Sequence, residues 1–189
     1  TLDTICWQAK LAGNDAIFDT TYSLASLLRA SMGNTDPYIT VSQELSYIRD
    51  YIQIQKARFR DKIQANIAVE PALMPVMIPK LILQPIVENA IKYGVGDKKG
   101  GGTVWISVRR EGDSALVEIR DDGVGVDARN LNELPIRDDG KTHVGLHNVQ
   151  ARVKLMAGGS LEFFSKKDWG TIVTIKVPWR RKTHEYTGS

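Results

Sequence analysis

The sequence predicts an α+β protein in which a helical hairpin is followed by a two-layer α/β sandwich with a mixed sheet. Apolar residues recur at helical spacing over about the first 60 residues. Further along, they alternate in short runs that are separated by turn residues and by two helical stretches. Consecutive hairpins with helices between them are typical of a sheet covered by helices on one face. We therefore divide the chain into helical residues 1–60, an α/β domain at 61–179 and a polar tail at 180–189.

Two amphipathic helices are expected in the helical region. The first runs from Leu2 to about Met32, and the GNTDP segment at 33–37 supplies its end. The second spans 41–59 and carries one apolar stripe made of Leu45, Ile48, Tyr51 and Ile52. Because a lone hairpin cannot bury both of its stripes, we expect two copies of the chain to pair into a four-helix bundle. Packing of the hairpin on its own downstream domain is the alternative.

The α/β domain is expected to alternate strands and helices. Its predicted elements are a strand at 63–70, a proline-rich connector at 71–79, a helix at 80–93, strands at 103–110 and 115–121, a helix at 145–157, and strands at 161–165 and 171–177. The predicted inward-facing residues are Val104, Ile106, Val108, Val117 and Ile119 in the sheet and Leu146, Val149 and Val153 in the second helix. The other face of the sheet is expected to be partly exposed to water.

Bulk properties exclude several classes of protein. The net charge is +3, and the basic pairs are scattered near turns, so nucleic acid is not the expected partner. Cys6 is the single cysteine, which excludes a disulfide within the chain. The sequence contains neither an apolar run of membrane-spanning length nor a signal peptide. The chain begins at Thr1, inside a helical pattern, so we expect it to be a piece of a longer protein.

The segment DDGVGV at 121–126 follows a strand-like run and puts two acids in front of a pair of glycines. Gly123, Gly125 and Ala128 fit the GxGxxA pattern of a dinucleotide site. Such a site needs a second strand soon after the turn, but residues 129–143 show no apolar alternation. A phosphate would also meet the two acids without a cation between them. We therefore do not expect a dinucleotide site here.

The helix before this turn carries a group of polar side chains. Asn89, Lys92 and Tyr93 lie at i, i+3 and i+4, so an amide, an ammonium and a phenol share one helix face, while Glu88 points about a quarter-turn away. An amide oxygen suits a Mg²⁺ shell made otherwise of water and phosphate, and a lysine one turn later suits the same phosphates. A solvated helix face capped by Gly94 is the alternative.

Four spaced motifs together resemble the ATP-binding domain shared by histidine kinases, gyrase-type topoisomerases and Hsp90-type chaperones. These motifs are VENAIKYG, VEIRDDGVGV, HVGLHNVQARV and WGTIVTIKVP. The stretches QELSYIRDYIQIQKARF and LQPIVENAIKYG are similar to those of the LytS/YehU type of sensor histidine kinase. The resemblance covers the chain from about Thr1 to Pro178. It implies the Bergerat ATP-binding fold for the α/β domain, with ATP and Mg²⁺ as ligands.

The resemblance assigns the base side of the site to the glycine turn and to the last strand. In that family the first acid of the turn, here Asp121, accepts a hydrogen bond from the exocyclic amine of adenine. A water is often shared with the threonine of the last motif, here Thr171. Gly123 and Gly125 then shape the turn and let the backbone come close to the adenine.

The phosphate side is assigned to two helices and the lid between them. By resemblance, Asn89 binds Mg²⁺, and Lys92 and Tyr93 flank the phosphates and the sugar or base. Residues 127–144 form the mobile lid. Gly145 and Leu146 begin a helix whose N-terminus faces the phosphates, where anions are favoured.

The chain also departs from the family pattern. ATP hydrolases of this fold carry a glutamate four residues before the magnesium asparagine, and this position is Pro85 here. Because proline is neither an acid nor a base, transfer to a protein side chain is expected in place of hydrolysis. The first glycine of the lid is replaced by His143. The family places its phosphoacceptor histidine at the start of the first helix, just upstream of residue 1.

The three histidines of the chain suggest no metal site. His143 and His147 have i, i+4 spacing, but no cysteine or third histidine is near them in the sequence, so contact with the lid or plain surface positions are expected. His184 lies in the polar tail. None of the three lies in the first helix, where the family places its phosphoacceptor. We therefore expect the chain to bind ATP but not to phosphorylate itself.

The resulting hypothesis is the cytoplasmic catalytic core of a bacterial inner-membrane sensor kinase. It predicts a homodimer through the N-terminal helices, a response-regulator receiver domain as partner, and membrane contact only through segments absent from this sequence. The γ-phosphoryl group would pass from Mg·ATP to an upstream histidine and then to an aspartate of the regulator. Two alternatives remain, an ATP-hydrolysing clamp of the same fold and a pseudokinase or dimerisation module with a vestigial pocket.

Overall fold

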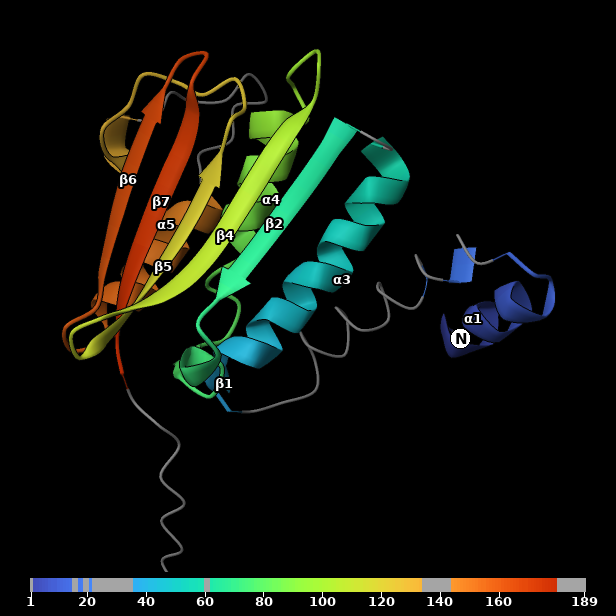
Figure 1. Ribbon diagram of the computed structural model, residues 1–189, viewed down its shortest axis with the longest axis horizontal. Helices are drawn as coiled ribbons and strands as arrows, with labels where there is room; N and C mark the ends of the chain where they lie inside the picture. The colour runs from blue at the N-terminus through green and yellow to red at the C-terminus, as the bar shows by residue number, and fades with distance from the viewer. Residues whose placement is uncertain are drawn as a thin grey trace, which may run out of the picture.

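The computed structural model describes residues 2–14, 17–18, 21, 36–59, 62–133 and 144–179 (Figure 1). The elements in chain order are α1 Leu2–Leu11, β1 Tyr38–Thr40, α3 Val41–Phe59, β2 Ile63–Val69, η2 Pro71–Leu73, β3 Met77–Pro79, α4 Gln84–Asn89, η3 Ala90–Val95, β4 Gly102–Glu111, β5 Ser114–Asp121, η4 Leu131–Glu133, α5 Val144–Lys154, β6 Ser160–Lys166 and β7 Gly170–Pro178.

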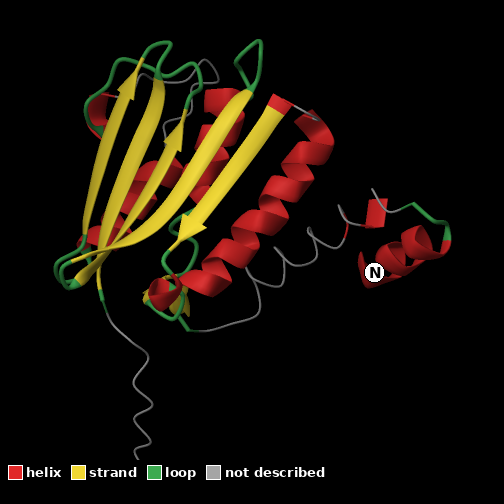
Figure 2. Cartoon of the chain, viewed as in Figure 1, coloured by secondary structure: helices red, strands yellow, loops and turns green. Residues whose placement is uncertain are grey.

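Five strands form one mixed sheet in the order β2-β4-β5-β7-β6. β2 runs parallel to β4, and the other neighbouring strands pair antiparallel. Parallel neighbouring strands need a long crossover connection, and the segment through η2, β3, α4 and η3 provides it between β2 and β4. The strands lie in front of α4 and α5 in Figures 1 and 2, so both helices cover the same face of the sheet. The predicted two-layer sandwich is therefore confirmed.

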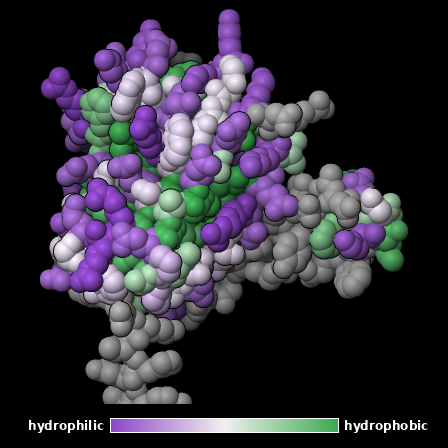
Figure 3. Space-filling view, in the orientation of Figure 1, coloured by the Kyte–Doolittle hydropathy of each residue, from purple (hydrophilic) through white to green (hydrophobic). Residues whose placement is uncertain are grey.

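Alternation along the strands decides which side chains enter the core. All of the predicted inward residues of the sheet and of α5 are buried, from Val104 at 0% exposed to Leu146 at 4%. The opposite face is open, and Figure 3 shows hydrophilic residues over much of it with hydrophobic ones between them. On this face the guanidinium of Arg120 lies over the rings of Trp105 and Trp169, at 5.4 and 5.3 Å, and partly shields both rings from water.

Helix α3 has the predicted bounds, but its stripe has a different partner from the one expected. Leu45, Ile48, Tyr51 and Ile52 are each 6% exposed or less and belong to the same core as the sheet and α4. α3 lies alongside β2 in Figure 1. The stripe therefore packs on the chain's own domain, which was the alternative to a bundle between two copies. Helical periodicity defines an apolar face, but it does not say which surface covers that face.

The first helix is shorter than predicted. α1 ends at Leu11 and is followed by a turn in which Gly13 has a φ of +67°. Most of the predicted continuation to Met32 lies outside the described residues. None of the helices within the described ranges is long and apolar enough to cross a membrane.

The region between β2 and β4 also differs from its prediction. The proline-rich connector contains β3, which pairs antiparallel with β1 so that Ile39 faces Ile78. The helix expected at 80–93 begins at Gln84 and continues after Asn89 as the π-helical turn η3. Prolines and a short apolar run give no periodic signal for a strand of three residues, so this small sheet escaped the sequence analysis.

Candidate nucleotide-binding site

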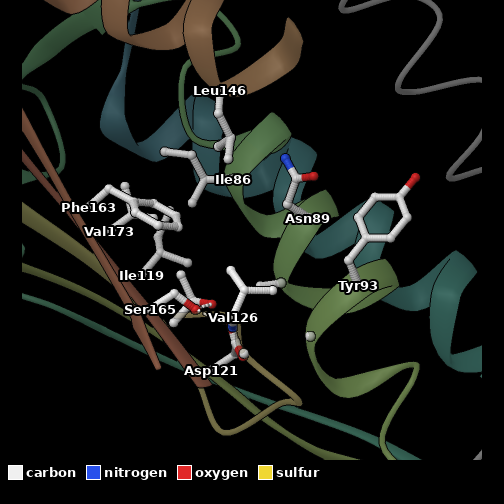
Figure 4. A pocket seen from close by; sticks show the side chains of 14 residues that line it. Ile86, Asn89, Tyr93, Ile119, Asp121, Val126, Leu146, Phe163, Ser165 and Val173 are labelled. Atoms are coloured by element: carbon white, nitrogen blue, oxygen red, sulfur yellow. Dashed lines mark hydrogen bonds between the residues drawn. The ribbon is translucent and has the colours of Figure 1, made fainter. Parts of the chain in front are cut away.

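A pocket that is partly open to solvent lies between the sheet and the helices that cover it. β5, β6 and β7 form its floor, α4 and η3 one wall, and α5 the roof (Figure 4). Its lining is mostly apolar and consists of Ile86, Asn89, Ala90, Tyr93, Gly94, Ile119, Asp121, Gly125, Val126, Leu146, Phe163, Ser165, Thr171 and Val173. A concave apolar site with a few converging polar groups is typical of small-molecule recognition.

Asp121 supplies the one carboxylate in this lining. It ends β5 and is 3% exposed, and its Oδ1 accepts a hydrogen bond of 2.8 Å from the N–H of Gly123. Burial raises the pKa of Asp121 to about 6 from its usual 3.8, and the neighbouring Asp122 adds to the rise. The backbone N–H groups of Gly123 and Thr171 and the charge of Lys98 act in the opposite direction. The fold thus holds a hydrogen-bond acceptor that is costly to bury at the floor of the pocket.

The second acid of the pair has a different task. Asp122 Oδ1 accepts a 2.8 Å hydrogen bond from the N–H of Thr103, and its Oδ2 lies 3.4 Å from Nζ of Lys98. The same Nζ donates to the backbone carbonyl of Asp122 at 2.6 Å. Asp122 therefore joins the end of β5 to the start of β4 and to the loop before it. The first acid faces the pocket, and the second fastens the strand that presents it.

The glycines of this turn allow two segments of backbone to meet. A Cβ on Gly123 would come well under 3.0 Å from the C, Cα and O atoms of Gly94, and a Cβ on Gly94 would lie 2.7 Å from Asp121 Oδ1. Gly125 has a φ of +55° and lines the pocket. Gly123 lies outside the lining, so its role is to bring η3 close to the turn.

Ser165 is a polar residue of the site that the sequence analysis missed. It is 2% exposed, and its hydroxyl accepts from the N–H of Val126 at 3.0 Å and lies 3.1 Å from the carbonyl of Gly170 and 2.9 Å from the hydroxyl of Thr171. When the Ser165 proton goes to Gly170, Thr171 donates to Ser165 and presents only acceptor lone pairs to the pocket. The available signal was a serine at an inward position of a strand whose other inward residues are apolar.

Asn89 and Tyr93 project from the α4 and η3 wall, side by side (Figure 4). The Nδ2 of Asn89 donates a 2.7 Å hydrogen bond to the carbonyl of Pro85. This bond orients the amide and leaves Oδ1 available as an acceptor or a metal ligand. Tyr93 is 41% exposed and lines the mouth of the pocket.

Lys92 does not join these two residues. Its Nζ lies 3.6 Å from the carboxylate of Glu88, and the side chain is not part of the lining. Glu88 is the i, i+4 neighbour of Lys92, so helical spacing by itself allows this pair. The chain changes to π-helical hydrogen bonding at Ala90, and the N–H of Gly96 donates to the carbonyl of Ile91.

Helix α5 contributes Leu146 to the roof, whereas Gly145 lies outside the lining and is exposed. His143 and most of the predicted lid lie outside the described residues, so the pair that it would form with His147 has no described geometry. Across the described ranges, no three or more His, Cys, Asp and Glu side chains are grouped to hold a metal. A single protein ligand, the Oδ1 of Asn89, is enough for a Mg²⁺ ion that takes its other ligands from phosphate and water.

Comparison with known proteins gives consistent matches. Residues 77–181 match the model of the family described as histidine kinase-, DNA gyrase B-, and HSP90-like ATPase, and residues 1–63 match the histidine kinase model. The chain is 34% identical over 161 residues to the sensor histidine kinase YpdA of Escherichia coli K12, an alignment that covers 85% of this chain and 28% of that protein. It is 29% identical over 184 residues to the sensor histidine kinase YesM of Bacillus subtilis 168, covering 96% of this chain and 31% of YesM.

Solved structures show the same fold. The histidine kinase AdeS of Acinetobacter baumannii has a TM-score of 0.57 at 16% identity, with 96% of both chains covered. The histidine kinase domain of the blue-light activated kinase of Erythrobacter litoralis EL346 has a TM-score of 0.55 at 19% identity, with 91% of this chain and 79% of that domain covered.

The match to the ATPase family spans more than half of the chain, and it includes every pocket residue identified above. The chain spans 28% and 31% of the lengths of YpdA and YesM. Both relatives are sensor histidine kinases, the class that the stretches QELSYIRDYIQIQKARF and LQPIVENAIKYG resemble. The chain therefore belongs to the histidine kinase-, DNA gyrase B- and HSP90-like ATPase family.

Proposed function

We propose that the chain is the ATP-binding catalytic core of a two-component sensor histidine kinase. In this proposal the γ-phosphoryl group of Mg·ATP passes to a histidine and then to an aspartate of a response-regulator receiver domain. The observation that carries the proposal is the buried carboxylate of Asp121 at the floor of an apolar pocket whose mouth is formed by Asn89 and Tyr93.

The floor of the pocket suits adenine better than guanine. Asp121 offers a carboxylate, and Thr171 offers acceptor lone pairs, directly or through a water. The exocyclic amine of adenine donates to acceptors, whereas guanine would present its carbonyl oxygen at the same position. Apolar side chains of Ile119, Val126 and Val173 then cover the purine faces and remove them from water.

The mouth of the pocket suits the phosphates. Asn89 Oδ1 would hold Mg²⁺, which when bound neutralises phosphate charge, and Tyr93 would flank the sugar or base. The N-terminus of α5, at Gly145 and Leu146, is a favourable place for anionic oxygens. In this proposal Lys92 contacts the phosphates only after its ion pair with Glu88 has broken.

Transfer is favoured over hydrolysis by the residue at the start of α4. Pro85 holds the position where ATP hydrolases of this fold carry a glutamate, and its carbonyl is occupied by Asn89. No group at this position activates water. The Asn89 amide is instead fixed for binding. Catalysis would therefore depend on positioning and on charge neutralisation.

The partners follow from the kind of relative. The names of YpdA and YesM identify them as sensor histidine kinases, which supports a homodimer, a receiver-domain partner and a cytoplasmic location beside a bacterial inner membrane. Because α3 buries its stripe in its own domain, the dimer contact in this proposal is made by the residues before β1 and does not extend to residue 60.

Nucleotide binding by this 189-residue chain tests the proposal. Calorimetric titration in Mg²⁺ is expected to give a heat of binding with ATP and none with GTP at the same concentrations. With γ-labelled ATP we expect no acid-labile label, because the histidines present, His143, His147 and His184, lie outside the first helix. Negligible heats with both nucleotides would contradict the proposal and favour a vestigial pocket. Rapid steady-state release of phosphate would favour the hydrolysing clamp.

A further inference from the structure

Helix α4 cannot cap its own N-terminus. The residue at its N-cap, Leu83, has an apolar side chain and makes no side-chain cap hydrogen bond. The first N–H groups of a helix have no partner within the helix. Pro85 removes one of these donors because it has no N–H. The N–H groups of Leu83 and Gln84 are left, in a region where both the Leu83 and Ile86 side chains are at most 2% exposed.

A carboxylate from a distant helix satisfies these donors. Glu44, in the first turn of α3, is 0% exposed. Its Oε1 accepts from the N–H of Leu83 at 2.9 Å and from that of Gln84 at 3.4 Å, and its Oε2 accepts from the N–H of Leu81 at 2.8 Å. The negative charge also lies at the positive end of the dipole of α4.

Glu44 additionally holds a strained part of the chain. Leu81 has a φ of +58°, a left-handed conformation that is unfavourable for a residue with a branched side chain. Burial raises the pKa of Glu44, while the three N–H groups and the charge of Arg152 on α5 oppose the rise. The carboxylate therefore lies where α3 meets the segment that begins α4.

We propose that Glu44 is a positioning residue of the nucleotide site, which fixes the start of α4 and thereby the place of the Asn89 amide at the mouth of the pocket. The link is short, because Asn89 is bonded to the carbonyl of Pro85, the second residue of α4. Glu44 itself is not part of the pocket lining. The proposal rests on the proposed function, since it concerns the Mg·ATP held by Asn89.

The test compares Glu44→Gln with a control variant of similar stability. A glutamine keeps the shape of the side chain and one acceptor oxygen, but its amide group faces an N–H donor. Val177→Ala is the control, because Val177 is 0% exposed in β7 and lies six residues, about 20 Å, along the strand from Thr171. The Kd for ATP is measured for wild type and both variants with Mg²⁺ and with EDTA, well below each melting temperature.

We expect Mg²⁺ to tighten ATP binding by the wild type and by Val177→Ala to the same extent. In Glu44→Gln the ratio of the Kd in EDTA to the Kd in Mg²⁺ should fall roughly fivefold or more, while the Kd in EDTA itself changes less. An unchanged gain in Glu44→Gln would overturn the positioning role, because a purely structural residue would lower only the melting temperature. Failure of the wild type to bind ATP would instead overturn the proposed function. Should Glu44→Gln not fold, Glu44→Asp, which keeps the charge with a shorter reach, is measured in the same way and is expected to lose part of the gain.

Discussion

Replacement of Asp121 by asparagine is expected to weaken ATP binding by roughly tenfold or more, which corresponds to the loss of one charge-assisted hydrogen bond. The Oδ1 atom of the new side chain can still accept from the N–H of Gly123, as Asp121 does now. The amide group would then point its N–H donors at the exocyclic amine of adenine, which is itself a donor. Titration calorimetry of the variant and the wild type at pH 8 measures the difference.

The same substitution is expected to stabilise the protein without nucleotide as the pH rises above about 4, with the full effect reached above pH 6. The folded-state pKa of Asp121 is raised to about 6 from 3.8, so its contribution favours folding below about pH 4 and is lost as the pH rises through 6. A shift of this size corresponds to at most about 3 kcal/mol in the free energy of unfolding. The variant and the wild type should therefore unfold alike at pH 4, with the variant gaining relative stability up to about pH 7. Chemical unfolding across this pH range tests the expectation.

Asp122→Asn is the matched control for the affinity measurement. The side-chain oxygen of the new amide can still accept from the N–H of Thr103, and the lost ion pair with Lys98 is more than a third exposed and contributes little. We expect ATP affinity to change by less than about threefold, because Asp122 does not line the pocket. Equal losses of affinity in the two variants would contradict the assignment of the first acid to the base.

Replacement of Gly123 by alanine is expected to abolish ATP binding and to lower the free energy of unfolding by about 3 kcal/mol or more. The added Cβ would overlap three backbone atoms of Gly94, and a backbone cannot rotate away as a flexible side chain can. Relief requires that η3 and the glycine turn separate, which moves Asp121, Gly125 and Tyr93 apart. Thermal unfolding and ATP titration of the variant measure both effects.

Gly100→Ala is the control for this substitution. A Cβ on Gly100 meets nothing within 4 Å, and its backbone does not have the positive φ that disfavours alanine. We expect wild-type affinity and a melting temperature within about 2 °C of the wild type, as for a surface substitution. Normal ATP binding by Gly123→Ala would show that the contact between Gly94 and Gly123 does not shape the pocket.

Much of the proposed nucleotide pocket could be predicted from the sequence. Alternation along β4 and β5 and the helical period of α5 identified inward residues, and all of those predicted are buried. The motifs named six residues that all line the pocket, which are Asn89, Tyr93, Asp121, Gly125, Leu146 and Thr171. The buried positions are predictable because strand and helix periods are local properties of the chain, whereas the pocket residues came from the resemblance of the motifs to a known family.

Other residues acquired their roles only through tertiary packing. Ser165 meets Val126 across 39 residues, and Glu44 meets Leu83 across 39, so no local spacing marks either contact. The stripe of α3 was visible in the sequence, but only the fold showed that β2 and α4 cover it. The sequence by itself determined which faces are apolar and which side chains carry chemistry. The tertiary structure decided which of those faces meet, because packing free energy depends on surfaces that lie far apart along the chain.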